Sequence, residues 1–342
     1  MNDNLPLIHV EGSPAVRGRA YGSQAARRIQ NTFAFYDQHL FAASPLTPEQ
    51  IRDRAARVAD VIDVFDPHYT EEIHSIARGA ALEPWQIYAL NARTEILNAR
   101  ALECTALYFQ ESAVLGQTWD WVRELEQLMV LLQVDYPDGR TLLTLTEPGM
   151  LAKVGLNNAG LGVCLNILLA PHPLDGVPVH VLLRAILECP DIPVARDVIG
   201  RAGSGRSSHF LIGDDSGRCV GLEFAGVARR ELHPQDGVLL HTNHCLAPDL
   251  KSDVMPTSLQ RYDRAEEWLR KTGGRDHDAL LTILSDQSEG NNSILCPYHP
   301  DATLGDQQVG TCATIVMDLP ARTLALRRGT HPDAPFYRYT LD

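Results

Sequence analysis

The sequence predicts a mixed α+β protein with largely antiparallel sheets, and three observations lead to this prediction. In the first hundred residues, apolar positions recur at helical spacing. From Cys104 onward, short β-rich runs are separated by turn motifs such as Pro137-Asp138-Gly139. The later helical runs are grouped beside strands and do not alternate with them one for one, which argues against a parallel α/β sheet.

Two helix-start signals define the N-terminal part. Ser13 before Pro14 predicts a helix that runs to about His39. The segment Thr47-Pro48-Glu49-Gln50 combines a proline at the first helical position with a capping box, so a second helix begins there. Two further helices are expected over residues 71–80 and 84–99.

The remaining two thirds of the chain are predicted to be rich in strands. Expected strands cover 104–109, 113–121, 128–136, 141–146, 161–165, the surroundings of 210 and 222, and 311–319, 323–327 and 336–341. Expected helices cover 179–187, 193–201 and 258–270.

Composition restricts the class of protein. Of 342 residues, 44% are hydrophobic and 21% charged, close to the globular average, which excludes disordered and fibrous proteins. Acidic residues outnumber basic ones 43 to 30, and the net charge of −13 makes nucleic acid an unsuitable partner. No apolar run reaches about 18 residues and no signal-peptide pattern is present, so we expect no membrane association. Seven cysteines without CxxC pairs indicate reduced thiols in the cytoplasm.

Cys104 is the cysteine whose position indicates chemistry. It opens the first strand after the helical part, and a hairpin follows. A turn centred on Ser112 makes residue 120 the antiparallel partner of residue 104. Residue 120 is an aspartate, so the spacing predicts a carboxylate beside a thiol. Trp119 and Trp121 alternate with Asp120 and are expected to pack in a core layer on the opposite face.

A thiol at the start of a strand can act without a histidine if the chain is cut before it. The freed α-amino group, with a pKa of about 8 in model peptides, can take the thiol proton at neutral pH. The reaction then needs a donor for the oxyanion. Asn243 lies at the polar end of an apolar strand, which suits that role.

Two other kinds of site compete with this interpretation. His241, His244 and Cys245 could be zinc ligands, although their spacing fits no common zinc pattern. A papain-like pair of Cys104 and a distant histidine would need the cysteine at a helix N-terminus, whereas β-forming residues follow it.

Six short motifs occur in the order seen in N-terminal-nucleophile hydrolases and span almost the whole chain. With them the sequence resembles the acyl-CoA:6-aminopenicillanic acid acyltransferase family (peptidase family C45), with bile-salt hydrolase and penicillin V acylase as more distant relatives. The motifs are Gly12-Ser13-Pro14-Ala15-Val16-Arg17-Gly18-Arg19-Ala20-Tyr21-Gly22, Glu103-Cys104-Thr105, Gly116-Gln117-Thr118-Trp119-Asp120-Trp121, Gly160-Leu161-Gly162-Val163-Cys164-Leu165-Asn166, His241-Thr242-Asn243-His244 and Met317-Asp318-Leu319.

The resemblance implies a single domain over residues 1–342 with a four-layer αββα sandwich. It also implies a precursor that cuts itself between Glu103 and Cys104, giving a helical α chain of 1–103 and a β chain of 104–342 that stay together as an αβ heterodimer.

The resemblance further implies roles for four residues. Cys104 would be the nucleophile and, through its α-amino group, its own base, while Asp120 would orient that group. Asn243 would donate to the oxyanion, and Asn166 matches an active-site asparagine of the bile-salt hydrolases.

The implied reaction is attack on an amide or thioester carbonyl, followed by transfer of the acyl group to an amine. The expected partners are a small-molecule acyl donor, such as an acyl-CoA or another acyl thioester, and an amine acceptor, with no cofactor and no metal. Water as acceptor would make the protein an amidohydrolase. An unprocessed relative that only binds a ligand is the third interpretation.

The sequence departs from the family pattern at several positions. Glu103 stands where the acyltransferase that names the family has glycine. Gln117 and Thr118 stand where bile-salt hydrolases carry arginine and asparagine. No lysine or arginine occurs between Arg275 and Arg322, although the family places arginines there, so the resemblance assigns no active-site arginine.

Overall fold

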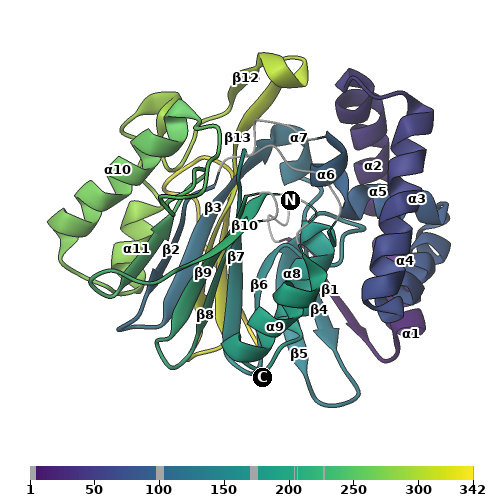
Figure 1. Ribbon diagram of the computed structural model, residues 1–342, viewed down its shortest axis with the longest axis horizontal. Helices are drawn as coiled ribbons and strands as arrows, with labels where there is room; N and C mark the ends of the chain where they lie inside the picture. The colour runs from purple at the N-terminus through teal and green to yellow at the C-terminus, as the bar shows by residue number, and fades with distance from the viewer. Residues whose placement is uncertain are drawn as a thin grey trace.

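The computed structural model describes residues 5–97, 104–169, 176–203, 205, 207–225 and 228–341. Two β-sheets lie face to face, with helices covering both outer faces (Figure 1). The α+β class and the four-layer αββα sandwich are therefore confirmed.

The larger sheet has eight strands within the described residues, in the order β1-β4-β5-β6-β7-β8-β9-β10. Neighbouring strands are antiparallel, except that β1 and β4 run parallel. The strands are β1 Leu7–Glu11, β4 Val130–Asp135, β5 Thr141–Thr146, β6 Val154–Asn157, β7 Leu161–Ile167, β8 Ser208–Asp214, β9 Cys219–Ala225 and β10 Ala228–Leu232.

The smaller sheet has seven strands in the described part of the chain. Six follow the order β11-β2-β3-β13-β14-β15, and β12 pairs with β13. The strands are β2 Ala106–Phe109, β3 Val114–Val122, β11 Val238–His241, β12 His299–Asp301, β13 Gln307–Asp318, β14 Thr323–Arg328 and β15 Tyr337–Thr340.

The helices form the two outer layers. In Figure 1 the N-terminal helices α1–α5 lie at the right, and α10 and α11 lie at the left against the smaller sheet, while α8 and α9 pack on the larger sheet. The helices are α1 Pro14–Gln24, α2 Ala26–Phe35, a π-helix Tyr36–Phe41, α3 Pro48–Phe65, α4 Pro67–Ala80, α5 Pro84–Asn91, α6 Arg93–Leu97, α7 Arg123–Glu126, α8 Val179–Leu187, α9 Ile192–Ala202, α10 Pro256–Thr272 and α11 His277–Ile283, with short 3₁₀ turns at Gly290–Asn292 and Ala302–Leu304.

Both predicted helix starts are confirmed. The Val16 N–H donates to the Ser13 hydroxyl, and Thr47 and Gln50 form both bonds of a capping box. The first helix is shorter than expected, because it ends at Gln24 and the chain continues as a separate α-helix and a π-helix. The structure also contains strands β1, β6, β10 and β12 and helices α7 and α11, which were not predicted.

The hairpin of β2 and β3 differs from the prediction by one residue. Ala106 pairs with Gln117 and Phe109 with Val114, so residue 104, if the register is extended, lies opposite residue 119 and not 120. The predicted pairing of Cys104 with residue 120 is wrong because the turn between the strands holds four residues, 110–113. An even number of turn residues places the centre of the hairpin between two residues, whereas the prediction placed it on Ser112.

The core lies mainly between the sheets and under the N-terminal helices. Trp119 and Trp121 are both buried there, as predicted. The two sheets approach closely at Gly213, where an added Cβ would lie 2.3 Å from the ring of Tyr108. A second apolar cluster fills the space between the smaller sheet and helices α10 and α11.

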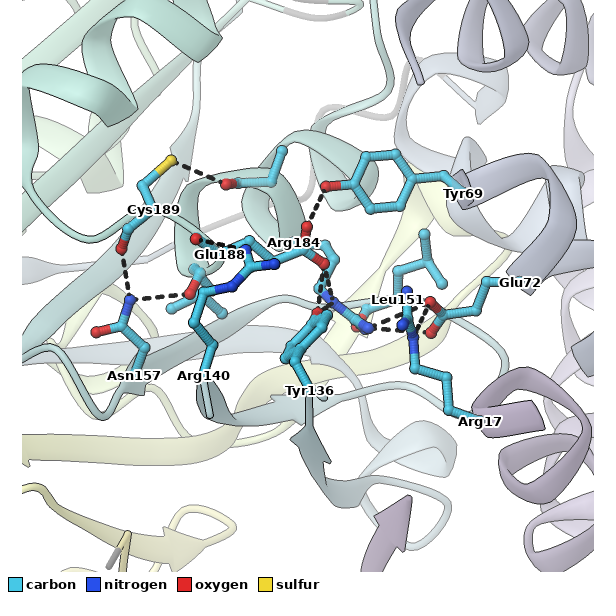
Figure 2. A network of polar contacts seen from close by, with 12 residues as sticks. Arg17, Tyr69, Glu72, Tyr136, Arg140, Leu151, Asn157, Arg184, Glu188 and Cys189 are labelled. Atoms are coloured by element: carbon cyan, nitrogen blue, oxygen red, sulfur yellow. Dashed lines mark hydrogen bonds and ion pairs between the residues drawn. The ribbon is translucent and has the colours of Figure 1, made fainter. Parts of the chain in front are cut away.

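A buried polar network connects the N-terminal helices to the larger sheet (Figure 2). Arg184 on α8 donates to Glu72 on α4 at 3.0 Å, and Arg17 on α1 donates to the same carboxylate at 2.5 Å. Tyr69 of α4 donates to Glu188 beyond the end of α8 at 2.8 Å. Residues 5–97 are thus attached to the rest of the chain by buried charges as well as by the β1–β4 pairing.

Candidate active site

Cys104 lies two residues before β2 and is 7% exposed. Its main-chain nitrogen donates to Asn243 Oδ1 at 2.8 Å. Its carbonyl oxygen accepts from Asn166 Nδ2 at 3.0 Å and from Arg261 Nη1 at 2.9 Å. Side chains from three other elements therefore hold both main-chain polar groups of this residue.

The residues around Cys104 come from distant parts of the sequence. Asn166 lies in β7 of the larger sheet, Asn243 is the second residue after β11, and Asp120 lies in β3. The structure thus brings together the four described residues that the sequence analysis selected. Glu103, on the other side of the expected cleavage site, lies outside the described residues.

Asn243 is held at every polar atom of its side chain. Its Oδ1 accepts from Cys104 N and from Arg261 Nη2 at 2.9 Å, and its Nδ2 donates to the Ile167 carbonyl at 2.9 Å. Its backbone N–H donates to Ser258 Oγ at 2.8 Å. The nitrogen Nδ2 carries two hydrogens, so a second N–H exists besides the one donated to Ile167.

Asp120 contacts Cys104 although the two are not strand partners. Its backbone N–H is hydrogen-bonded to the Cys104 thiol, and its carboxylate accepts from Thr311 Oγ1 at 2.6 Å. Thr311 lies at the bulge in the pairing of β13 with β3. Bulges commonly redirect side chains beside active sites, and here the bulge adjoins the residue that contacts the Asp120 carboxylate.

The Cys104 thiol is protonated at neutral pH. Burial raises its pKa to about 12, and the Asp120 carboxylate adds to this effect. The Lys153 ammonium, the Asp120 backbone N–H and the Arg261 guanidinium oppose it. A thiol in this state needs a base in contact with it before it can attack a carbonyl.

Lys153 is a buried cation close to this site. Its Nζ lies 3.2 Å from Glu147 Oε1 and 3.9 Å from the ring centroid of Trp119. Burial and the nearby Arg93 guanidinium lower its pKa to about 8. Arg93 also donates to Glu147, so one carboxylate neutralises two buried cations.

Arg261 and Lys153 were not predicted as site residues, although the sequence around each carries a local signal. On α10, the buried positions Ser258, Arg261 and Ala265 follow helical spacing, so the arginine falls on the inner face of the helix. Lys153 follows three apolar residues and precedes Val154 at the start of β6. A cation on an apolar face or in an apolar run is the signal that would have found both.

The competing sites do not assemble around the predicted residues. His241 bonds to Glu223 and to the Thr242 carbonyl, and His244 bonds to Ser258. In the ranges that the structure describes, no group of three or more His, Cys, Asp or Glu side chains could hold a metal ion. Cys104 precedes a strand, which is not the helix N-terminus that a papain-like site requires.

Two neighbouring cavities flank helix α3. One has a volume of about 370 Å³ and the other of about 550 Å³, and Val61 lines both. Cys104 is not among the described residues that line either cavity.

Comparison with known proteins identifies the family. Residues 109–331 match the family model of acyl-coenzyme A:6-aminopenicillanic acid acyltransferase. The chain is 30% identical, over 347 residues, to the 40 kDa form of acyl-coenzyme A:6-aminopenicillanic-acid-acyltransferase of Emericella nidulans, covering 96% of this chain and 95% of that protein. The chain belongs to this acyltransferase family. Membership supports an enzyme of acyl transfer or amide hydrolysis.

Among solved structures, the acyltransferase-family chain is similar to an acylase, an acid amidase ortholog and a bile acid hydrolase. Penicillin V acylase from Agrobacterium tumefaciens gives a TM-score of 0.47 at 11% identity, covering 70% of this chain and 86% of that one. The Caenorhabditis elegans ortholog of N-acylethanolamine-hydrolyzing acid amidase gives a TM-score of 0.46 at 15% identity, covering 70% of this chain and 100% of that one. A mutant conjugated bile acid hydrolase from Clostridium perfringens gives a TM-score of 0.45 at 12% identity, covering 70% of this chain and 97% of that one.

In the part of the chain that the structure describes, none of the helices combines the length and the apolar character that crossing a bilayer requires.

Proposed function

We propose that this member of the acyltransferase family cuts itself before Cys104 and then uses Cys104 as the nucleophile of acyl transfer to an amine. The observation that carries the proposal is the hydrogen bond of 2.8 Å from Cys104 N to Asn243 Oδ1. This contact would hold the α-amino group beside the thiol after cleavage, where that group can serve as the base that a buried thiol needs.

Self-cleavage would proceed through a thioester. Cys104 Sγ attacks the carbonyl carbon of residue 103, the bond from that carbon to Cys104 N breaks, and the thiol proton passes to the nitrogen. Water then hydrolyses the thioester, which releases the main-chain α-carboxylate of Glu103 and restores the Cys104 thiol. The products are the α chain of 1–103 and the β chain of 104–342.

In the processed enzyme, the α-amino group takes the thiol proton as Sγ attacks the acyl donor. The second N–H of Asn243 Nδ2 donates to the oxyanion that forms, since the first is used by Ile167. The leaving group departs with the proton and leaves an acyl thioester on Cys104. An amine then attacks this thioester, forms the amide and returns the thiol.

The donor and the acceptor are proposed as chemical classes. The printed name of the Emericella relative refers to an acyl-coenzyme A and to an amine, 6-aminopenicillanic acid. We carry over only an acyl thioester or amide as donor and an amine as acceptor, without a cofactor. All seven cysteines are free, which fits the reducing cytoplasm.

Intact mass under denaturing conditions tests the self-cleavage. We expect the wild-type chain to give two masses, for 1–103 and 104–342, and Cys104→Ala to give one. Cys245→Ser is the matched control, because this half-buried cysteine lies outside the proposed machinery, and it should be cut like the wild type. An uncut wild-type chain, or a cut Cys104→Ala chain, contradicts the proposal.

The same preparation separates transferase from amidohydrolase. An acyl thioester is supplied with and without a primary amine, and the acyl products are quantified. Predominance of the amide over the free acid at millimolar amine supports the transferase. Free acid as the main product in both cases identifies an amidohydrolase.

A further inference from the structure

The Arg261 guanidinium reaches three groups around Cys104 from a helix that the sequence analysis did not connect with the site. Nη1 donates to the Cys104 carbonyl at 2.9 Å and to Thr105 Oγ1 at 3.0 Å, and Nη2 donates to Asn243 Oδ1 at 2.9 Å. The side chain is fully buried. None of the reaction steps above uses this residue.

The first consequence concerns the orientation of the Asn243 amide. A guanidinium only donates hydrogen bonds, so the Asn243 atom that faces Arg261 must be the oxygen. The same oxygen accepts from Cys104 N. Arg261 therefore fixes which end of the amide faces the future α-amino group, and it directs Nδ2 to the other side.

The second consequence is electrostatic. Arg261 Nη2 and Cys104 N donate to the same oxygen, so a permanent positive charge lies two hydrogen bonds away from the nitrogen that becomes the base. A neighbouring cation disfavours the protonated form of an amine and lowers its pKa. More of the α-amino group is then free to accept the thiol proton at neutral pH.

Charged and titratable groups on the other elements around Cys104 also act on it. The Asp120 carboxylate of β3 raises the pKa of the Cys104 thiol. The Lys153 ammonium before β6 lowers it, as the Arg261 guanidinium does. The Cys164 thiol of β7 is buried and its pKa is raised, so it is neutral. His209 of β8 is connected to Cys104 through Asn166, and burial lowers its pKa, so it too is neutral. Lys153 and Arg261 thus oppose the Asp120 carboxylate. Of these two cations, Arg261 is the one that donates a hydrogen bond to the main chain of Cys104.

We propose that Arg261 is a positioning residue for acyl transfer, which fixes the Asn243 amide and by its charge keeps the α-amino group of Cys104 in its base form. This inference rests on the proposed cleavage before Cys104. An arginine on α10 would then act in a site to which the family resemblance assigned none.

Two substitutions separate the charge from the geometry. Arg261→Gln removes the charge and keeps an amide that can donate, whereas Arg261→Lys keeps the charge and loses the forked guanidinium. Arg264→Met is the matched control on the same helix, because Arg264 pairs with Asp286 and contacts none of the groups around Cys104. Denaturing mass spectrometry first establishes that each variant is cut.

The readout is the pH profile of kcat/KM with a short acyl thioester of N-acetylcysteamine and a primary amine. We expect the acid limb to move to higher pH by about one unit in Arg261→Gln and to stay in place in Arg261→Lys and Arg264→Met. We also expect kcat to fall about tenfold in Arg261→Lys with little change in KM, because the fork no longer fixes Asn243.

The outcomes distinguish this inference from the proposed function. If the wild-type chain is not cut, the proposed function fails. If the processed Arg261→Gln enzyme has the acid limb of the wild type, the electrostatic role of Arg261 is overturned. Should Arg261→Gln not fold, Arg261→Lys still decides the positioning role, since a wild-type kcat in that variant overturns it.

Discussion

The imidazole ring of His209 stacks on that of His241, with the ring centroids 3.6 Å apart and the planes inclined by 13°. His241 Nε2 bonds to Glu223 Oε1 at 2.8 Å, and His209 Nδ1 bonds to Asn166 Oδ1 at 3.1 Å. An amide oxygen only accepts, so His209 donates from Nδ1. Buried contacts therefore extend from Glu223 through two rings to Asn166, which in turn holds the Cys104 carbonyl.

His209→Leu should weaken the hold on Asn166. Burial and the neighbouring His241 keep the pKa of His209 well below its usual value, so a neutral donor is lost and no charge is removed. A hydrogen bond of about 1 kcal/mol corresponds to a loss of roughly fivefold in kcat/KM. His74→Leu, on α4 beside Tyr88, is the control. A wild-type kcat/KM in His209→Leu would show that the contacts from Glu223 to Asn166 do not contribute to the reaction.

Local signals in the sequence predicted most of the helices and strands. Strand register and contacts between distant segments could not be predicted from such signals. The capping box at Thr47 and the turn at Pro137-Asp138-Gly139 act over a few residues, and the structure contains both features. The β2–β3 register depends on the number of turn residues, and placing the centre on Ser112 moved it by one position. The parallel β1–β4 pair joins distant segments, which no local pattern predicts.

The candidate site shows the same limit. Cys104, Asp120 and Asn243 stand out by their positions at strand ends and by the motifs that contain them. Arg261 shares its helix with other arginines, and only helical spacing separates the buried one from those at the surface. Its contact with Cys104 depends on how α10 packs on the smaller sheet, which is a property of the whole fold.

Substitutions at Asn243 distinguish its two proposed roles. Asn243→Ala should lower kcat by roughly a hundredfold or more if the side chain donates to the oxyanion. Asn243→Asp keeps an oxygen that faces Cys104 N but has no N–H to donate, so it should lose activity as well. Asn157→Ala is the control, since this buried amide also donates to main-chain carbonyls, those of Leu187 and Cys189. Near-normal turnover by Asn243→Asp would show that Asn243 holds Cys104 N but does not donate to the oxyanion.

Lys153 should give the stability a characteristic dependence on pH. The folded chain releases its proton near pH 8 and the unfolded chain near 10.5. Between these values the unfolded chain binds more protons, so the free energy of unfolding rises with pH, by on the order of 3 kcal/mol. Below pH 8 both states are protonated and this contribution is absent.

The measurement is urea unfolding of the uncut Cys104→Ala chain with and without Lys153→Met. The difference in unfolding free energy between the two proteins should change in favour of the lysine protein from pH 8 to 10.5. A difference that stays constant over this range would show that the environment of Lys153 does not lower its pKa.

Glu72→Gln should weaken the attachment of residues 1–103 to residues 104–342 (Figure 2). The carboxylate lies between Arg17 and Arg184, so its loss leaves two buried cations with less compensation, which costs about 3–5 kcal/mol. In the processed enzyme the two chains should separate at lower urea concentration, as followed by size-exclusion chromatography.

The control for Glu72→Gln is Asp135→Asn. Asp135 and His9 also join the two parts of the chain, but both side chains are substantially exposed, at 32% and 52%. An exposed pair contributes at most about 1 kcal/mol, so separation should occur near the wild-type urea concentration. Equal behaviour of the two variants would contradict the role given to the buried network.

In the proposed reaction, the acyl group is carried on Cys104 at a new N-terminus. The direct test is to mix processed enzyme with excess acyl thioester in the absence of amine, to quench in acid within seconds, and to measure the mass of each fragment. We expect one acyl group on the 104–342 fragment, located on Cys104 by peptide mapping and removed when an amine is added before quenching. An acyl group on any other residue would contradict it.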